Sequence, residues 1–127
     1  MVYTEKMTKT KKTPTQLRRE IETIKRELAK LEGLRPGSLS EQYNVCGNPN
    51  CKCKEKPPKK HGPYHQLSYT RSGRSSSRFV RKPEVPRIRK ELQNYAKLRE
   101  LVDRWIELET QISELKTAEM RLAQTAS

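Results

Sequence analysis

Residues 46–64, CGNPNCKCKEKPPKKHGPY, contain all three cysteines of this 127-residue chain and one of its two histidines. Cys46, Cys51 and Cys53 are followed by His61 in the spacing C-x4-C-x-C-x7-H. Three thiolates and an imidazole are ligands that tetrahedral Zn²⁺ prefers. An odd number of cysteines argues against a complete set of disulfides. The spacing therefore predicts one structural zinc ion bound by these four residues.

The segment 34–63 around the cysteines has too few apolar residues to build a hydrophobic core of its own. Zinc binding contributes about 10 kcal/mol or more to the folding of such segments, so the metal would replace the missing core. Gly47 and Pro49 favour a chain reversal that returns the later cysteines to the first. The second histidine, His65, is an alternative fourth ligand, but we favour His61 because it falls in a loop. An iron–sulfur cluster would need a fourth cysteine.

A first amphipathic helix is predicted over residues 13–33. Thr13 before Pro14, with Gln16 three residues after the threonine, is typical of a helix start with a capping box. Gly33 is expected to end the helix. Its apolar residues recur at spacings of three and four and are Leu17, Ile21, Ile24, Leu28 and Leu31.

A second, longer helix is predicted over residues 83–118 and is expected to pack antiparallel to the first, as in a coiled-coil hairpin. The shorter helix would cover only the first half of the longer one. An apolar stripe would then remain without an intramolecular partner, which predicts a homodimer through the second helix. The stripe consists of Trp105, Ile106, Leu108, Ile112 and Leu115.

Two short strands at 64–70 and 75–81, joined by a turn that contains Gly73, predict a β-hairpin over residues 64–82. His65, Leu67 and Tyr69 alternate along the first strand and share one face. The predicted fold is therefore a small α+β fold in which two antiparallel helices flank a zinc-stapled β-hairpin. Its organisation is a disordered basic arm at 1–12, a single domain at 13–118 and a frayed tail at 119–127.

The net charge of +13 is concentrated in the middle of the chain. Residues 34–84 hold eleven Lys and Arg against three Glu, whereas residues 85–127 hold eight against seven acidic residues. Positive charge focused on a compact segment predicts a surface that binds a polyanion. The residues expected to contact nucleic acid are Lys52, Lys54, Lys59, Lys60, Arg71, Arg74, Arg78, Arg81, Lys82 and Arg87.

Composition excludes several classes of protein. Hydrophobic residues make up only 31% of the chain, which is too few for an enzyme with a deep apolar pocket. The sequence has no apolar run of the length that spans a bilayer and no secretory signal, so we expect a cytoplasmic protein without a membrane partner. No catalytic motif is present and four ligands would close the zinc site, so we expect neither enzymatic activity nor a small-molecule substrate.

The motifs resemble those of a family of small bacterial and archaeal proteins known as a domain of unknown function. The resemblance covers about residues 17–115 and rests on 36–39 (PGSL), the cysteine motif, 61–64 (HGPY) and 67–69 (LSY). It implies a helix, a cysteine-rich hairpin and a long helix, with Cys46, Cys51, Cys53 and His61 at the matching positions. The family commonly has an aromatic residue where this chain has His65, which weakens a ligand role for that histidine.

These features predict a zinc-stabilised accessory or regulatory module that binds nucleic acid. A ribbon tipped with Arg71 and Arg74 could enter a major groove, and Tyr64 and Tyr69 offer rings for stacking on unpaired bases. The sequence leaves DNA and RNA as open alternatives. The alternative function is a protein-interaction adaptor that presents the long helix and does not bind nucleic acid.

Overall fold

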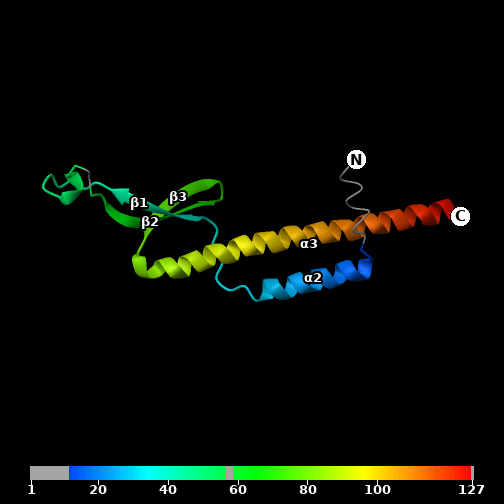
Figure 1. Ribbon diagram of the computed structural model, residues 1–127. Coiled ribbons are helices and arrows are strands. Elements are labelled where there is room, and N and C mark those ends of the chain that lie inside the picture. The colour runs from blue at the N-terminus through cyan, green and yellow to red at the C-terminus, as the bar shows by residue number, and fades with distance from the viewer. Residues whose placement is uncertain (1–11, 57–58, 127) are drawn as a thin grey trace. The chain divides into compact units, whose positions relative to one another are not determined.

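The computed structural model describes residues 12–56 and 59–126 (Figure 1). In chain order the elements are α2 (Pro14–Ala29), β1 (Ser38–Asn44), the 3₁₀ helix η1 (Lys52–Lys54), β2 (His61–Arg71), β3 (Arg74–Val80), the 3₁₀ helix η2 (Lys82–Glu84) and α3 (Val85–Ala126). This order confirms the small α+β fold. The arm expected at 1–12 lies, except for Lys12, outside the described residues.

The chain divides into two compact units. The helical unit comprises α2 and the later part of α3, within Met1–Leu31 and Lys97–Ser127. The sheet unit, Glu32–Ala96, comprises the three strands, both 3₁₀ helices and the start of α3. The single module expected from the sequence therefore consists of two units. None of the described helices combines the length and the apolar character that crossing a membrane requires.

Helix α2 begins as predicted. The Thr13 hydroxyl accepts a hydrogen bond from the Gln16 amide at 3.2 Å, and the Gln16 side chain accepts one from the Thr13 amide at 2.9 Å. This reciprocal pair is the capping box. The predicted end near Gly33 is wrong, because α2 stops at Ala29. Asn94 is buried and donates to the carbonyls of Glu32 and Gly33, so the chain after α2 is held in the sheet unit.

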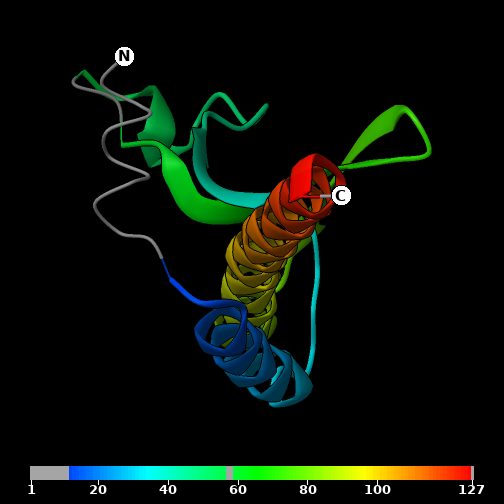
Figure 2. The same cartoon turned by 90° about the vertical axis from the view of Figure 1, so that its right-hand side faces the viewer.

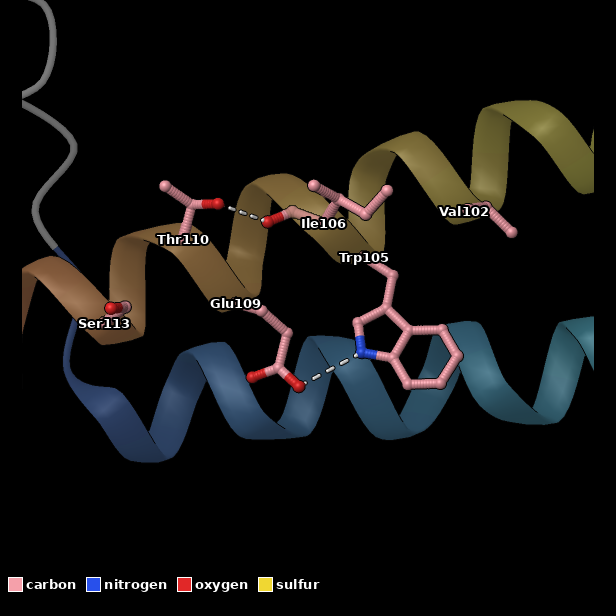
Figure 3. Close-up of a pocket in the computed structure, with 6 residues that line it drawn as sticks. All are labelled: Val102, Trp105, Ile106, Glu109, Thr110 and Ser113. Atoms are coloured by element: carbon pink, nitrogen blue, oxygen red, sulfur yellow. Dashed lines mark hydrogen bonds between the residues drawn. The ribbon is translucent and has the colours of Figure 1, made fainter.

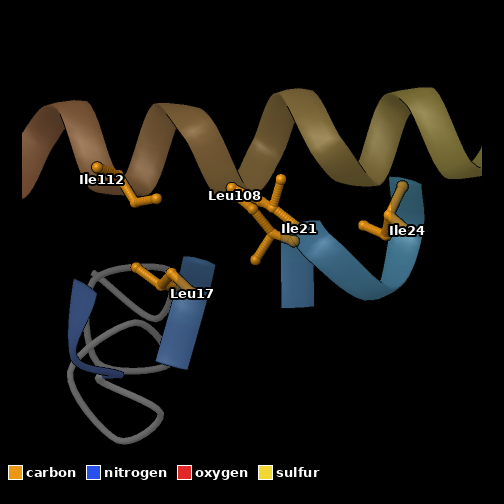
Figure 4. Close-up of a cluster of buried hydrophobic side chains, with 5 residues drawn as sticks. All are labelled: Leu17, Ile21, Ile24, Leu108 and Ile112. Atoms are coloured by element: carbon orange, nitrogen blue, oxygen red, sulfur yellow. The ribbon is translucent and has the colours of Figure 1, made fainter. Parts of the chain in front are cut away.

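The helical unit has its own apolar core. Leu17, Ile21 and Ile24 of α2 pack with Leu108 and Ile112 of α3 (Figure 4). The two helices lie side by side in both views of the ribbon (Figures 1 and 2). The two helices run antiparallel, as predicted, because later residues of α2 pair with earlier residues of α3. The ion pairs that show this order are Arg18–Glu109, Glu20–Arg104 and Glu27–Lys97.

The predicted unpartnered stripe on the long helix is wrong. Leu108 and Ile112 are 0% and 3% exposed, and Trp105 and Leu115 pack against the same core. Figure 3 shows Trp105 directed towards α2 while its indole donates to Glu109 at 3.3 Å. Trp105 and Leu115 are partly buried, and of the five residues only Ile106, 60% exposed, is mainly open to solvent. The burial of this stripe removes the argument from which a dimer was predicted.

The start of α3 is covered by the sheet, which explains why α2 packs farther along. Val85 and Ile88 of α3 form a buried cluster with Leu67 and Val80 of the sheet. The apolar residues at the start of α3, which we expected to pack on α2, are therefore already buried against the sheet. Helix α2 packs instead on residues farther along α3, such as Leu108 and Ile112. The helix also extends beyond the predicted end at 118, since the segment expected to be a frayed tail is helical as far as Ala126.

The sheet has three antiparallel strands in the order β1-β2-β3, whereas the sequence predicted only two. The missing strand, β1, pairs with β2 through Leu39↔Leu67 and Glu41↔His65. Its apolar pattern is weak because one of its inward positions is a glutamate. Glu41 lies 3.8 Å from both the His65 imidazole and the Arg89 guanidinium.

The β2–β3 hairpin confirms the predicted turn. Ser72 and Gly73 have φ angles of 53° and 76°, and positive φ at both central residues is the geometry that suits a two-residue hairpin turn. The register places Val80 opposite His65 and Phe79 opposite Gln66. His65, Leu67 and Val80 therefore share the buried inner face, and Phe79 lies on the outer face.

Candidate metal centre and basic surface

The three cysteines and His61 come together in the structure. We call residues 45–60, between β1 and β2, the cysteine loop; its residues 57 and 58 lie outside the described part of the chain. Cys46 follows β1, the 3₁₀ helix η1 carries Cys53, and His61 begins β2. The loop therefore brings its ligands to the end of the sheet at which β1 ends and β2 begins (Figure 1).

The geometry fits a metal ion. The four candidate ligand atoms of Cys46, Cys51, Cys53 and His61 all lie within 4.8 Å of one another. The Cys46 and Cys53 sulfurs are 3.5 Å apart, and the Cys51 sulfur is 3.0 Å from the Nε2 atom of His61. Sulfurs bound to one tetrahedral zinc are separated by about 3.8 Å, whereas a disulfide needs about 2.05 Å. The cluster could therefore hold a metal ion, and its cysteines are free thiols.

A tight turn returns the chain to the first cysteine. The Cys51 amide donates to the Asn48 carbonyl at 3.2 Å, and the Asn50 amide donates to the Asn48 side chain at 3.1 Å. Pro49 occupies the second position of this turn, where its fixed φ is favoured. Asn48 was missed in the sequence, although an asparagine before proline is a known turn signal.

The two sulfurs that lie closest to each other ionise differently. The backbone hydrogen bond at Asn48 lowers the pKa of the Cys46 thiol, and the hydrogen bond with the Cys53 thiol adds to this effect. Burial raises the pKa of the Cys53 thiol, which is only 1% exposed. The Cys46 thiol thus ionises more readily than the Cys53 thiol, and a bound cation would favour the thiolate form of both.

The two histidines have different surroundings. His65 lies on the buried inner face beside Glu41, and its ring belongs to the packing of the sheet. His61 alone joins the cysteine cluster. This agrees with the preference for His61 drawn from the sequence, although His61 lies in a strand and not in the loop that we expected.

Gly62 positions His61, and the sequence analysis did not identify this role. Its φ is +142°, and a Cβ atom would lie 2.7 Å from the Gln42 carbonyl oxygen and 2.8 Å from the Tyr43 ring. A register shift in β1 between Gln42 and Asn44 lies at the same point. Only glycine therefore allows β1 and β2 to approach this closely beside His61, the candidate ligand.

We expect Gly62→Ala to weaken metal binding and to destabilise the sheet unit by about 1–3 kcal/mol, because the backbone strain and the clash both displace His61. Competition with a chromogenic chelator measures the affinity. Gly47→Ala is the matched control, since a Cβ atom there meets nothing within 4 Å. Equal metal affinity for the two variants would contradict this role.

Seven of the ten residues expected to bind nucleic acid fall into two exposed groups within the sheet unit. Lys52, Lys54, Lys59 and Lys60 lie in the cysteine loop at one end of the sheet. Arg71, Arg74 and Arg78 lie on the β2–β3 hairpin, whose turn is at the opposite end. The strand register places these three arginines on the same face as Leu67, and Ser75 and Ser77 on the other.

Three further candidates lie at the end of β3 and at the start of α3. Arg81 and Lys82 are exposed at the end of β3. Arg87 pairs with Glu84 and Glu91 at 3.5 and 3.0 Å, so its charge is already balanced. Arg87 is therefore the weakest of the predicted contacts.

The fold and the site define a small α+β protein with a Cys₃His cluster that could hold a metal ion. Residues 14–90 match a family model described as "Domain of unknown function (DUF6788)". Because this match spans more than half of the chain, the protein belongs to that family, which confirms the expected membership of a domain of unknown function. The match ends before the part of α3 that packs against α2. No curated protein and no solved structure matches the chain.

Proposed function

We propose that this protein is a zinc-stabilised module that binds nucleic acid through the sheet unit, in an accessory or regulatory role. The zinc is assigned from the ligands, because a Cys₃His set in a closed tetrahedron is typical of structural zinc. Such a site leaves no open position for a substrate, so we propose no enzymatic activity.

The unbalanced charge of the sheet unit carries the proposal. Glu32–Ala96 holds fourteen Lys and Arg against five Glu, a net charge of +9 out of +13 for the whole chain. Within the described residues, no lysine or arginine of the cysteine loop or the hairpin lies within ion-pair distance of a carboxylate. Glu41, Glu84 and Glu91 pair instead with Arg87 or Arg89 at the start of α3. Unpaired cations on a small surface attract phosphate groups and release their counterions.

The helical unit shows the opposite pattern. Five of its carboxylates pair with its own basic residues, for example Glu20 with Lys12 and Arg104. Its surface charge is therefore largely balanced internally. This contrast argues that the positive charge of the sheet unit serves more than solubility.

Binding of labelled 20-mer oligonucleotides by the zinc-loaded protein, followed by fluorescence anisotropy across a salt series, tests the proposal. We expect a dissociation constant in the micromolar range or below. The logarithm of the association constant should fall linearly with the logarithm of the salt concentration. Replacing Arg71, Arg74 and Arg78 together by Gln should weaken binding at least tenfold and reduce the salt slope by about 2–3.

The matched control replaces Arg19, Arg99 and Lys116 of the helical unit by Gln, which removes the same charge. We expect this variant to bind as the wild type does. Absence of binding at low salt would refute the proposal. Equal losses in the two triple variants would mean that net charge alone is responsible.

The adaptor function remains the second candidate, and one observation favours it. A shallow pocket on α3 is lined by Val102, Trp105, Ile106, Glu109, Thr110 and Ser113 (Figure 3). The exposed Ile106 beside the half-buried Trp105 offers an apolar contact for a protein partner. If no oligonucleotide binds, this surface becomes the leading candidate.

A further inference from the structure

The outer face of the sheet carries two exposed aromatic rings at the end next to the cysteine loop. Phe79 of β3 is 61% exposed and Tyr64 of β2 is 44% exposed. Their ring centroids lie 6.2 Å apart at an interplanar angle of 67°. This edge-to-face pair uses only one ring face for the internal contact, so other ring faces remain open.

The rest of the outer face is polar and consists of hydroxyl and amide side chains. Gln66 donates to the Ser77 hydroxyl at 3.2 Å, and the hydroxyls of Thr70 and Ser75 are 3.3 Å apart. A solvated face of this kind needs no aromatic residues for folding, because the buried cluster lies on the inner face. The exposed pair therefore calls for an explanation by binding.

A pocket lies beside this aromatic pair, against the metal cluster. It is lined by Asn44, Cys46, His61, Tyr64 and Phe79. The two rings supply apolar surface, and the Asn44 side-chain amide can both donate and accept hydrogen bonds. This amide has no hydrogen-bond partner within the part of the chain that the structure describes. Two metal ligands form one wall, so metal binding would hold the pocket in shape.

Positively charged residues directly precede one of the pocket residues in the sequence. Lys59 and Lys60 directly precede His61, and all the described lysines of the cysteine loop are exposed. An apolar pocket lined by His61, which directly follows two exposed and unpaired lysines in the chain, matches a ligand with a flat ring and a phosphate. It does not match an apolar protein surface, because covering it would bury the charged groups without partners.

We propose that this pocket takes an unpaired base of a single-stranded nucleic acid, and this inference rests on the nucleic-acid binding proposed above. The base stacks on the ring of Phe79 or Tyr64, the Asn44 amide bonds to its edge, and the lysines of the cysteine loop contact the phosphates. A duplex cannot bind in this way because its bases are stacked on one another. Duplexes then contact only the basic groups.

Replacing Phe79 by Ala in the zinc-loaded protein tests the proposal. We expect single-stranded 12-mers of DNA or RNA to bind about tenfold more weakly, since a stacked base contributes that much or more. Duplex affinity and the salt slope should stay unchanged. Phe79→Trp should restore binding, and Ser77→Ala, on the same face, should bind as the wild type does. A 2-aminopurine base in the strand should show fluorescence quenching that the Ala variant loses.

A strand of equal length with abasic sites carries the same phosphate charge without bases. We expect the wild type to bind this abasic strand as weakly as Phe79→Ala binds the normal strand. Comparing DNA with RNA then identifies the preferred strand. Equal binding of normal and abasic strands, or of wild type and Phe79→Ala, overturns the base pocket but leaves the proposed function intact. If neither single strands nor duplexes bind, the proposed function itself fails.

A wild-type dimer that Phe79→Ala dissociates in light scattering would instead assign the aromatic pair to contact between copies.

Discussion

Cys51→Ser is expected to abolish stoichiometric zinc binding and to unfold the cysteine loop while the helical unit remains folded. Among the described residues of the loop only Cys53 is buried, so hydrophobic burial contributes almost nothing to its order. Coordination would supply about 10 kcal/mol or more, and losing one of four ligands removes most of that energy.

Elemental analysis of the untagged protein measures the zinc content, which should fall from one ion per chain to none. Hydrogen exchange followed residue by residue should show faster exchange at the ends of β1 and β2 and in η1. Exchange in α2 should stay unchanged, because its core of Leu17, Ile21 and Ile24 lies in the other unit. A chelator added to the wild type should have the same effect as the substitution.

The two histidines provide a matched comparison for this prediction. His61→Gln should lose zinc as the cysteine variant does. His65→Gln should retain one zinc ion, since this ring packs on the inner face beside Glu41. Zinc retained by the first variant and lost by the second would reverse the assignment. A wild-type protein without any zinc would refute it.

The candidate metal ligands could be predicted from the sequence because a metal site depends on residue types at short spacings. Four ligands within sixteen residues must lie near one another in almost any compact loop, and the structure places them within 4.8 Å. The roles of Asn48 and Gly62 could not be read in the same way. Gly62 acts through a close approach to Gln42, which is twenty residues earlier in the chain.

The missed strand has a different cause. Apolar alternation identifies strands only where the buried face is apolar, and β1 turns Glu41 inward, where His65 and Arg89 face it. The hairpin was found because its turn residues, Ser72 and Gly73, carry a local signal that needs no tertiary partner.

The misplaced helix contact has another cause. Leu67 and Val80 belong to the two strands that were predicted, but the sequence did not show that their buried face packs on Ile88 at the start of α3, so α2 was expected to cover that residue. The three-stranded sheet buries Ile88 completely with Leu67. Helix α2 therefore packs against later residues of α3, and pairing of this kind depends on tertiary contacts that spacing alone does not reveal.

Leu108→Ala is expected to destabilise the helical unit by about 2.7–5 kcal/mol, the range for removing a fully buried leucine. Leu108 is 0% exposed and packs among Leu17, Ile21 and Ile112. The substitution removes apolar contacts and leaves a cavity between two helices that have few other buried residues. Thermal unfolding of the zinc-loaded protein, followed by circular dichroism at the helical wavelength, should show a midpoint lower by roughly 10–20 °C.

Ile106→Ala is the matched control, since it lies two residues away on the same helix and is 60% exposed. Both substitutions place alanine in a helix, so the gain in helix propensity is similar in the two variants. We expect the control to change stability by no more than about 0.5 kcal/mol. If α3 instead formed a dimer through this region, Ile106→Ala would also destabilise, and the midpoint of the wild type would rise with protein concentration. A concentration-independent midpoint with a large effect only at Leu108 would show that the apolar residues of α3 are satisfied within one chain.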